Sequence, residues 1–158
     1  MSQLLGKELT QELFNLLNGE NVAFKMGKAI VIVTVDEKEW PHPAMLSYYE
    51  VVAKERSRID LAIGKTSTTA KNLRRSGKIT LLITDSGINY YLKGNAREVK
   101  ESMEGVPFIS LFRVKIEQLL EDQEPDAAII SGVTFSRPQK KEVNALVEKI
   151  FQGIRSEP

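Results

Sequence analysis

The sequence predicts a mostly β domain, an antiparallel barrel that is closed or partly open and has short helices outside it. Two observations lead to this prediction. Segments rich in β-branched residues follow one another through short polar turns, as at residues 29–35 and 36–39. Short connections of this kind favour antiparallel pairing. Helical patterns also do not alternate regularly with the strands, which argues against a parallel doubly wound sheet.

Length and composition indicate one ordinary globular domain over residues 1–158. Hydrophobic residues make up 42% and charged residues 27%, and the net charge of +1 gives no bulk attraction to nucleic acid or an anionic membrane. Cysteine is absent and His42 is the one histidine, which excludes disulfides, thiolate catalysis and a multi-histidine metal site within one chain. Neither a signal peptide nor a membrane-spanning apolar run is visible, so we expect a cytoplasmic protein.

The individual elements follow from periodicity and from turn residues. Leucines at helical spacing predict a helix that ends at Asn18-Gly19, and an amphipathic helix is expected over residues 139–153. A short helix over residues 70–75 should close at Ser76-Gly77. Gly94 is expected to form a β-bulge. Strands are expected over residues 29–35 (buried on both faces), 43–52, 58–63, 78–84, 89–100, the start of 107–120, and 132–135.

Several side chains are interpreted first as structural. Trp40 is expected to pack half-buried, and His42, at the start of a strand, to be a surface or turn residue. Strand alternation predicts that one tyrosine of each adjacent pair, 48–49 and 90–91, points inward. Asp60 and Asp85 are assigned to turns or caps. No carboxylate pair or serine motif indicates hydrolytic chemistry.

The loop at residues 65–75 carries the strongest chemical signal. Hydroxyl side chains at residues 66–69 precede the predicted helix, and Lys71, Arg74 and Arg75 follow within its first turns. Cations there oppose the helix dipole, and an anion between them would explain their placement. The alternative is an ordinary cap beside a solvated basic face. The loop has neither the GxxxxGK[ST] nor the GxGxxG spacing, so triphosphate hydrolysis and Rossmann-type dinucleotide binding lose support.

Five segments, in this order and spacing, resemble the pyridoxamine 5′-phosphate oxidase-like family of FMN-binding split barrels. The resemblance covers under half of the chain and depends on the order of the segments rather than on any single one. The segments are WPHPAMLS at 40–47, IDLAI at 59–63, TAKNL at 69–73, KITLLI at 78–83 and KGNAREV at 93–99.

The resemblance implies a split barrel that binds FMN as a homodimer, with two cofactor pockets at the interface. By position, it implies that Thr68, Thr69 and Lys71 hold the FMN phosphate, and that Lys65, Ser67 and Arg74 are further candidates. It also implies that the flavin ring rests on the strand formed by Ala44, Met45, Leu46 and Ser47.

The function expected from this resemblance is flavin-dependent oxidation or reduction of an unknown substrate. A flavin carries its own redox chemistry, so no catalytic acid or base is named. Three alternatives stay open: a non-catalytic flavin-binding or stress-related protein, a barrel that binds haem or F420, and a barrel for another ligand or a protein partner. The chain lacks arginine and histidine motifs near residue 158, which argues against pyridoxamine phosphate oxidation, and haem ligation would depend on His42 alone.

Overall fold

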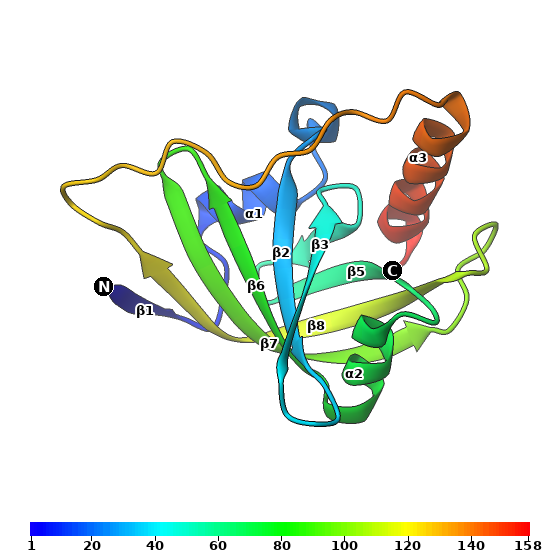
Figure 1. Ribbon diagram of the computed structural model, residues 1–158, viewed down its shortest axis with the longest axis horizontal. Coiled ribbons are helices and arrows are strands. Elements are labelled where there is room, and N and C mark those ends of the chain that lie inside the picture. The colour runs from blue at the N-terminus through cyan, green and yellow to red at the C-terminus, as the bar shows by residue number, and fades with distance from the viewer.

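The computed structural model describes residues 1–158, and its centre is an eight-stranded antiparallel sheet that curls into a half-open barrel (Figure 1). The strand order is β3-β2-β6-β7-β8-β5-β4, and β1 pairs with β8. Strands β3 and β4 end the row with one strand neighbour each, so the predicted split barrel is confirmed. The strands are β1 (Ser2–Gly6), β2 (Ala29–Val35), β3 (Pro41–Ser47), β4 (Val51–Glu55), β5 (Arg58–Gly64), β6 (Lys78–Asp85), β7 (Ile88–Lys100) and β8 (Ile109–Asp122).

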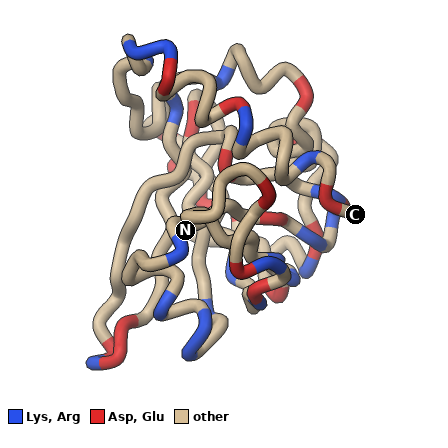
Figure 2. Tube along the Cα trace, turned by 90° about the vertical axis from the view of Figure 1, so that its right-hand side faces the viewer, with Lys and Arg blue, Asp and Glu red and all other residues tan.

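Three α-helices lie outside the sheet, as predicted. They are α1 (Gln11–Leu17), α2 (Thr68–Ser76) and α3 (Lys141–Ser156), and a 3-10 turn occupies Val22–Lys25. Thr10 caps α1, because its hydroxyl accepts a hydrogen bond from the Leu13 N–H at 3.2 Å. None of the helices is long and apolar enough to cross a membrane. Basic and acidic residues are interspersed along the chain (Figure 2).

Two hydrophobic cores lie on opposite faces of the sheet. The larger core fills the barrel around Phe112 and receives the buried leucines of α1. The smaller core lies under α3, where the ring of Phe151 contacts that of Tyr49 edge-on with centroids 5.4 Å apart. Ala62 on β5 and Leu111 on β8 belong to this second core, which explains why both strands are buried on both faces.

Three strand predictions need correction. The strand expected over residues 43–52 is two strands, β3 and β4, joined by a turn at Tyr48–Glu50. Tyr48 and Tyr49 lie in this turn, where strand alternation does not apply. Both are therefore buried, Tyr48 in the larger core and Tyr49 in the smaller one. Residues 132–135 form only an isolated bridge, Lys28↔Thr134, instead of a strand. Strand β2 has one fully buried face rather than two, and β1 was not predicted.

The predictions for Trp40 and Asp60 were wrong, and the prediction for Gly94 is confirmed. Trp40 is 68% exposed rather than half-buried. Asp60 does not cap a turn: it lies in the middle of β5 with an exposed fraction of 0%. The Gly94 bulge is confirmed by the register shift between Lys93 and Gly94. A Cβ at Gly94 would lie 2.6 Å from the Lys115 carbonyl oxygen, so the close strand approach needs glycine.

Candidate cofactor-binding site

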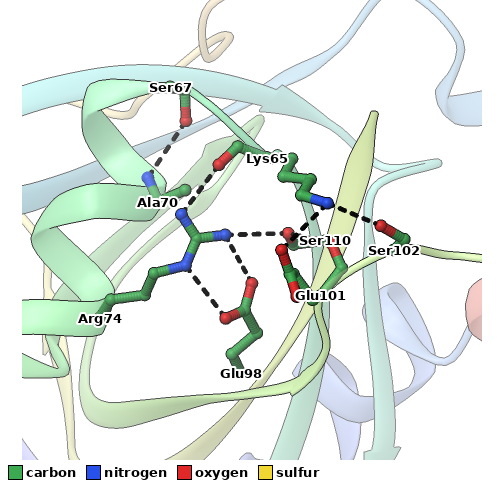
Figure 3. Close-up of polar contacts among 8 residues, drawn as sticks. All are labelled: Lys65, Ser67, Ala70, Arg74, Glu98, Glu101, Ser102 and Ser110. Atoms are coloured by element: carbon green, nitrogen blue, oxygen red, sulfur yellow. Dashed lines mark hydrogen bonds and ion pairs between the residues drawn. The ribbon is translucent and has the colours of Figure 1, made fainter. Parts of the chain in front are cut away.

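Helix α2 follows β5 after three residues and packs against β2, β5 and β7. The Ser67 hydroxyl caps the helix by accepting a hydrogen bond from the Ala70 N–H at 3.1 Å (Figure 3). The helix ends at Gly77, whose φ of 69° suits glycine and whose N–H donates to the Leu73 carbonyl. N–H groups in the first turn of a helix that have no internal partner can bind an anion.

A polar hollow of about 460 Å³ lies between α2 and the turn that joins β2 to β3. Lys71 is exposed there and takes part in none of the ion pairs. Asp36 is occupied by its own turn, since Oδ1 accepts hydrogen bonds from the Lys38 and Trp40 N–H groups at 2.8 and 2.9 Å. The lining residues are Asp36, Glu37 and Lys38 from the turn, and Thr68, Lys71, Asn72 and Arg75 from α2.

A buried hydrogen bond fixes α2 against β2 beside this hollow. The Asn72 Nδ2 donates to the Thr34 Oγ1 at 2.9 Å, and both residues are buried. Arg75 adds a second connection, because its guanidinium donates to the Val35 carbonyl. These contacts fix the backbone of α2, which carries Lys71, against the end of β2.

Lys65 and Arg74 belong to a separate ion-pair network, which joins the loop and α2 to Glu98 on β7 and to Glu101 (Figure 3). Arg74 binds Glu98 through hydrogen bonds of 3.0 and 2.6 Å and also donates to the Lys65 carbonyl and the Ser110 hydroxyl. These bonds with Arg74 hold the pKa of Glu98 below its usual value. The Lys65 ammonium lies 3.1 Å from Glu101 and 2.9 Å from the Ser102 hydroxyl. Lys65 and Arg74 therefore already have anionic partners.

Strand β3 presents an open edge to solvent. It pairs with β2 alone, with Val35 opposite Pro41 and Ala29 opposite Ser47. Prolines at positions 41 and 43 suit an edge strand. Along the second half of the strand Ala44 is half-buried, Met45 is 63% exposed, Leu46 is buried and Ser47 is half-buried. The open backbone edge can donate and accept hydrogen bonds.

Known proteins identify this fold. No protein-family model matches the chain. The uncharacterized Bacillus subtilis protein YclD is 29% identical over 147 residues, which cover 93% of this chain and 96% of YclD. A candidate pyridoxamine 5′-phosphate oxidase from Lactobacillus delbrueckii superposes with a TM-score of 0.61 at 18% identity, covering 75% of this chain and 98% of that one. The chain has the pyridoxamine 5′-phosphate oxidase-like split-barrel fold.

Proteins with this fold differ in the ligands that they bind or store. An FMN-binding protein from Syntrophomonas wolfei has a TM-score of 0.53 at 16% identity, covering 72% of this chain and 88% of that one. HutZ, a heme storage protein from Vibrio cholerae, has a TM-score of 0.51 at 14% identity, covering 71% and 93%. The fold is therefore shared, and the ligand has to be argued from the residues of this chain.

The split barrel brings some predicted site residues together and separates others. Thr68 and Lys71 share the polar hollow, whereas Thr69, in the first turn of α2, is buried and does not line it. Ser67 serves as the helix cap. The start of β3 lies opposite Val35 and so beside the hollow, while Ser47 is six residues further along, about 20 Å at the rise of an extended strand.

The sequence analysis did not identify Glu50 as a candidate functional residue. Its Oε2 accepts hydrogen bonds from the Ser47 N–H at 2.7 Å and the Ser47 hydroxyl at 2.9 Å. Burial raises the pKa of Glu50, and the Ser47 hydrogen bonds oppose that rise. The one local signal is a serine three residues before a glutamate, a pattern in which each residue can satisfy the other's neighbouring backbone.

Proposed function

We propose that this split barrel binds FMN and acts as a flavin-dependent oxidoreductase. The observation that carries the proposal is the exposed, unpaired Lys71 in a polar hollow at the start of α2. When bound, FMN would supply the hydride and electron transfer, so the protein needs to provide binding, orientation and access.

The phosphate group is assigned to the N-terminal part of α2. Lys71 offers an ammonium group, Thr68 a hydroxyl and the first helical turn its free N–H groups, and this donor set suits a phosphate. Thr69 would contribute through its backbone, because its side chain is buried. We assign Lys65 and Arg74 to holding the loop in place, since Glu98 and Glu101 already pair with them.

The flavin ring is assigned to β3, from Ala44 to Ser47. Its unpaired backbone edge suits the hydrogen-bonding edge of a flavin, and the side chain of Ala44 is small and half-buried. The same open edge and the exposed side chains of Trp40 and Met45 support a homodimer in which a second subunit covers the ring. Sedimentation equilibrium tests the dimer, and a monomer at all concentrations would contradict it.

Titration with FMN tests the proposal directly. Added FMN should bind saturably to the purified protein, with quenching of flavin fluorescence, and riboflavin should bind more weakly because it lacks the phosphate. Equal binding of both flavins would contradict the phosphate assignment. Absence of binding to either would reject the flavin proposal.

A non-catalytic flavin-binding role is the second candidate, because the proteins that share this fold include an FMN-binding protein and a heme storage protein. The two roles differ in turnover. If the protein is an oxidoreductase, its flavin absorbance in the blue should fall when NAD(P)H or another electron donor is added and should return when an electron acceptor is added. A carrier protein should keep its oxidised spectrum under the same treatment.

A further inference from the structure

A second hollow, of about 330 Å³, opens at the far end of β3. One wall is the extended segment at residues 133–138, which crosses above β2 before it reaches α3 (Figure 1). That segment is held in place by hydrogen bonds from the Ala29 N–H to the Val133 carbonyl and from the Phe135 N–H to the Gly27 carbonyl. Most of the lining is apolar, including Met26, Met45, Val133, Phe135, Val147 and Ile150.

Glu50 is the one charged residue in the lining of this apolar groove. Oε2 receives both hydrogen bonds from Ser47, which leaves Oε1 available. Glu50 takes part in none of the ion pairs of the structure. A carboxylate removed from water without a positively charged partner is unfavourable, and such groups often mark binding sites.

We propose that this groove binds a small organic cation, a protonated primary amine on an apolar body, whose ammonium group pairs with Glu50. The ammonium group supplies the positive charge that the protein does not provide there. The apolar walls bury the body of the ligand, and the volume lies in the lower range for small-molecule pockets. An anionic ligand would be repelled by the same carboxylate.

The groove is a different site from the polar hollow beside α2, since the two share no lining residue. Recognition of the amine by Glu50 therefore uses neither Lys71 nor the hollow assigned to the FMN phosphate. Its position is still relevant to the flavin proposal, because Ser47 and Met45 line the groove and also end the strand assigned to the ring.

Calorimetric titration of the full chain at neutral pH tests the proposal with three probes of similar size. Phenethylamine is cationic, phenethyl alcohol is neutral and hydrocinnamate is anionic. We expect the amine to bind about tenfold more tightly than the alcohol, as for a charge-assisted hydrogen bond, and hydrocinnamate to bind most weakly. Equal affinity of the wild-type protein for the amine and the alcohol, or no binding of the amine, would by itself overturn the proposal.

Two matched variants locate the preference. Glu50→Gln keeps an oxygen that can accept from Ser47 but removes the charge, and it should bring the amine affinity close to that of the alcohol. Glu148→Gln removes an exposed charge on α3 beside the lining residue Val147, and it should leave the preference intact. An equal loss in both variants, or no loss in Glu50→Gln, would contradict recognition by Glu50.

A third variant separates this inference from the flavin proposal. Lys71→Ala should leave the preference for the amine over the alcohol unchanged. Amine binding can therefore be confirmed even if FMN does not bind, and FMN binding can be confirmed even if the amine does not bind. A groove occupied by a second copy of the chain is the competing interpretation. In that case sedimentation would show an associated protein that binds no amine, which would overturn the proposal.

Discussion

Asp60 on β5 and Arg113 on β8 are joined by two hydrogen bonds, of 2.9 and 3.0 Å, although no solvent reaches the Asp60 side chain. The two residues lie directly opposite each other in the antiparallel register. The hydrogen bonds that Arg113 donates to the Asp60 carboxylate raise the pKa of Arg113. Arg113 is partly exposed and also donates to the Pro158 carbonyl, whereas the buried carboxylate of Asp60 has Arg113 as its ion-pair partner.

Replacing Arg113 should therefore destabilise the barrel strongly. Arg113→Met leaves the Asp60 carboxylate buried without its positive partner, and we expect a loss of about 3–5 kcal/mol in the free energy of unfolding. Urea denaturation measures it. Lys115→Met, two residues along β8 and with 80% of the lysine side chain exposed, is the control and should change stability by less than about 0.5 kcal/mol. Similar losses in the two variants would contradict the argument.

The Asp60–Arg113 pair also shows which features sequence reasoning can reach. Helix α2 was predicted because its cap, helix formers and Gly77 stop are neighbours in the sequence, and β6 and β7 were predicted in the same way. Asp60 was assigned to a turn because its partner is more than fifty residues away. Nothing local to residues 58–63 identifies which strand will lie opposite.

The hydrogen bond between Asn72 and Thr34 should position α2. Thr34→Val removes the hydroxyl and leaves the buried amide without its partner, at a cost of about 1–3 kcal/mol, and it should also weaken FMN binding by loosening the helix. A double-mutant cycle with Asn72→Leu measures the coupling. The double variant should be less destabilised than the sum of the single variants. Strict additivity would show that the bond does not couple the helix to the sheet.

Glu50 should make the free energy of unfolding fall as pH rises above the ordinary pKa of a glutamate. Burial raises its pKa in the folded protein above the usual 4.5, so the folded state binds the proton more tightly than the unfolded state. Its contribution is therefore fully present below 4.5 and is lost as pH rises through the raised pKa. Glu50→Gln should lack this dependence. Urea denaturation of both proteins between acidic and neutral pH measures the difference, and parallel curves would contradict the assigned direction.

Arg74 should matter more for stability than for cofactor binding. Arg74→Ala removes the partner that lowers the pKa of Glu98, a contribution present at neutral pH and lost as pH falls through that lowered pKa. Because both side chains are partly exposed, we expect roughly 1 kcal/mol of lost stability at neutral pH. FMN affinity should fall much less than in Lys71→Ala. A larger loss of FMN affinity in Arg74→Ala would place Arg74 at the phosphate.

Parts of the candidate site were visible in the sequence and others were not. The hydroxyls and cations of residues 65–75 stood out because they are contiguous. Which of these cations is free and which is paired depends on distant residues, because Lys71 faces the hollow beside the β2–β3 turn and Arg74 pairs with Glu98. Glu50 was missed because its apolar surroundings come from segments 133–138 and α3, far along the chain.

The central claim is that Lys71 holds the phosphate of FMN, and one comparison tests it most directly. Dissociation constants for FMN and riboflavin are measured with the wild-type protein, with Lys71→Ala and with Lys141→Ala, an exposed lysine on α3 that serves as the control. We predict that Lys71→Ala weakens FMN binding by about 1.5–3 kcal/mol, leaves riboflavin binding nearly unchanged, and that Lys141→Ala affects neither. Equal losses for FMN and riboflavin in Lys71→Ala, or no loss for FMN, would contradict the claim.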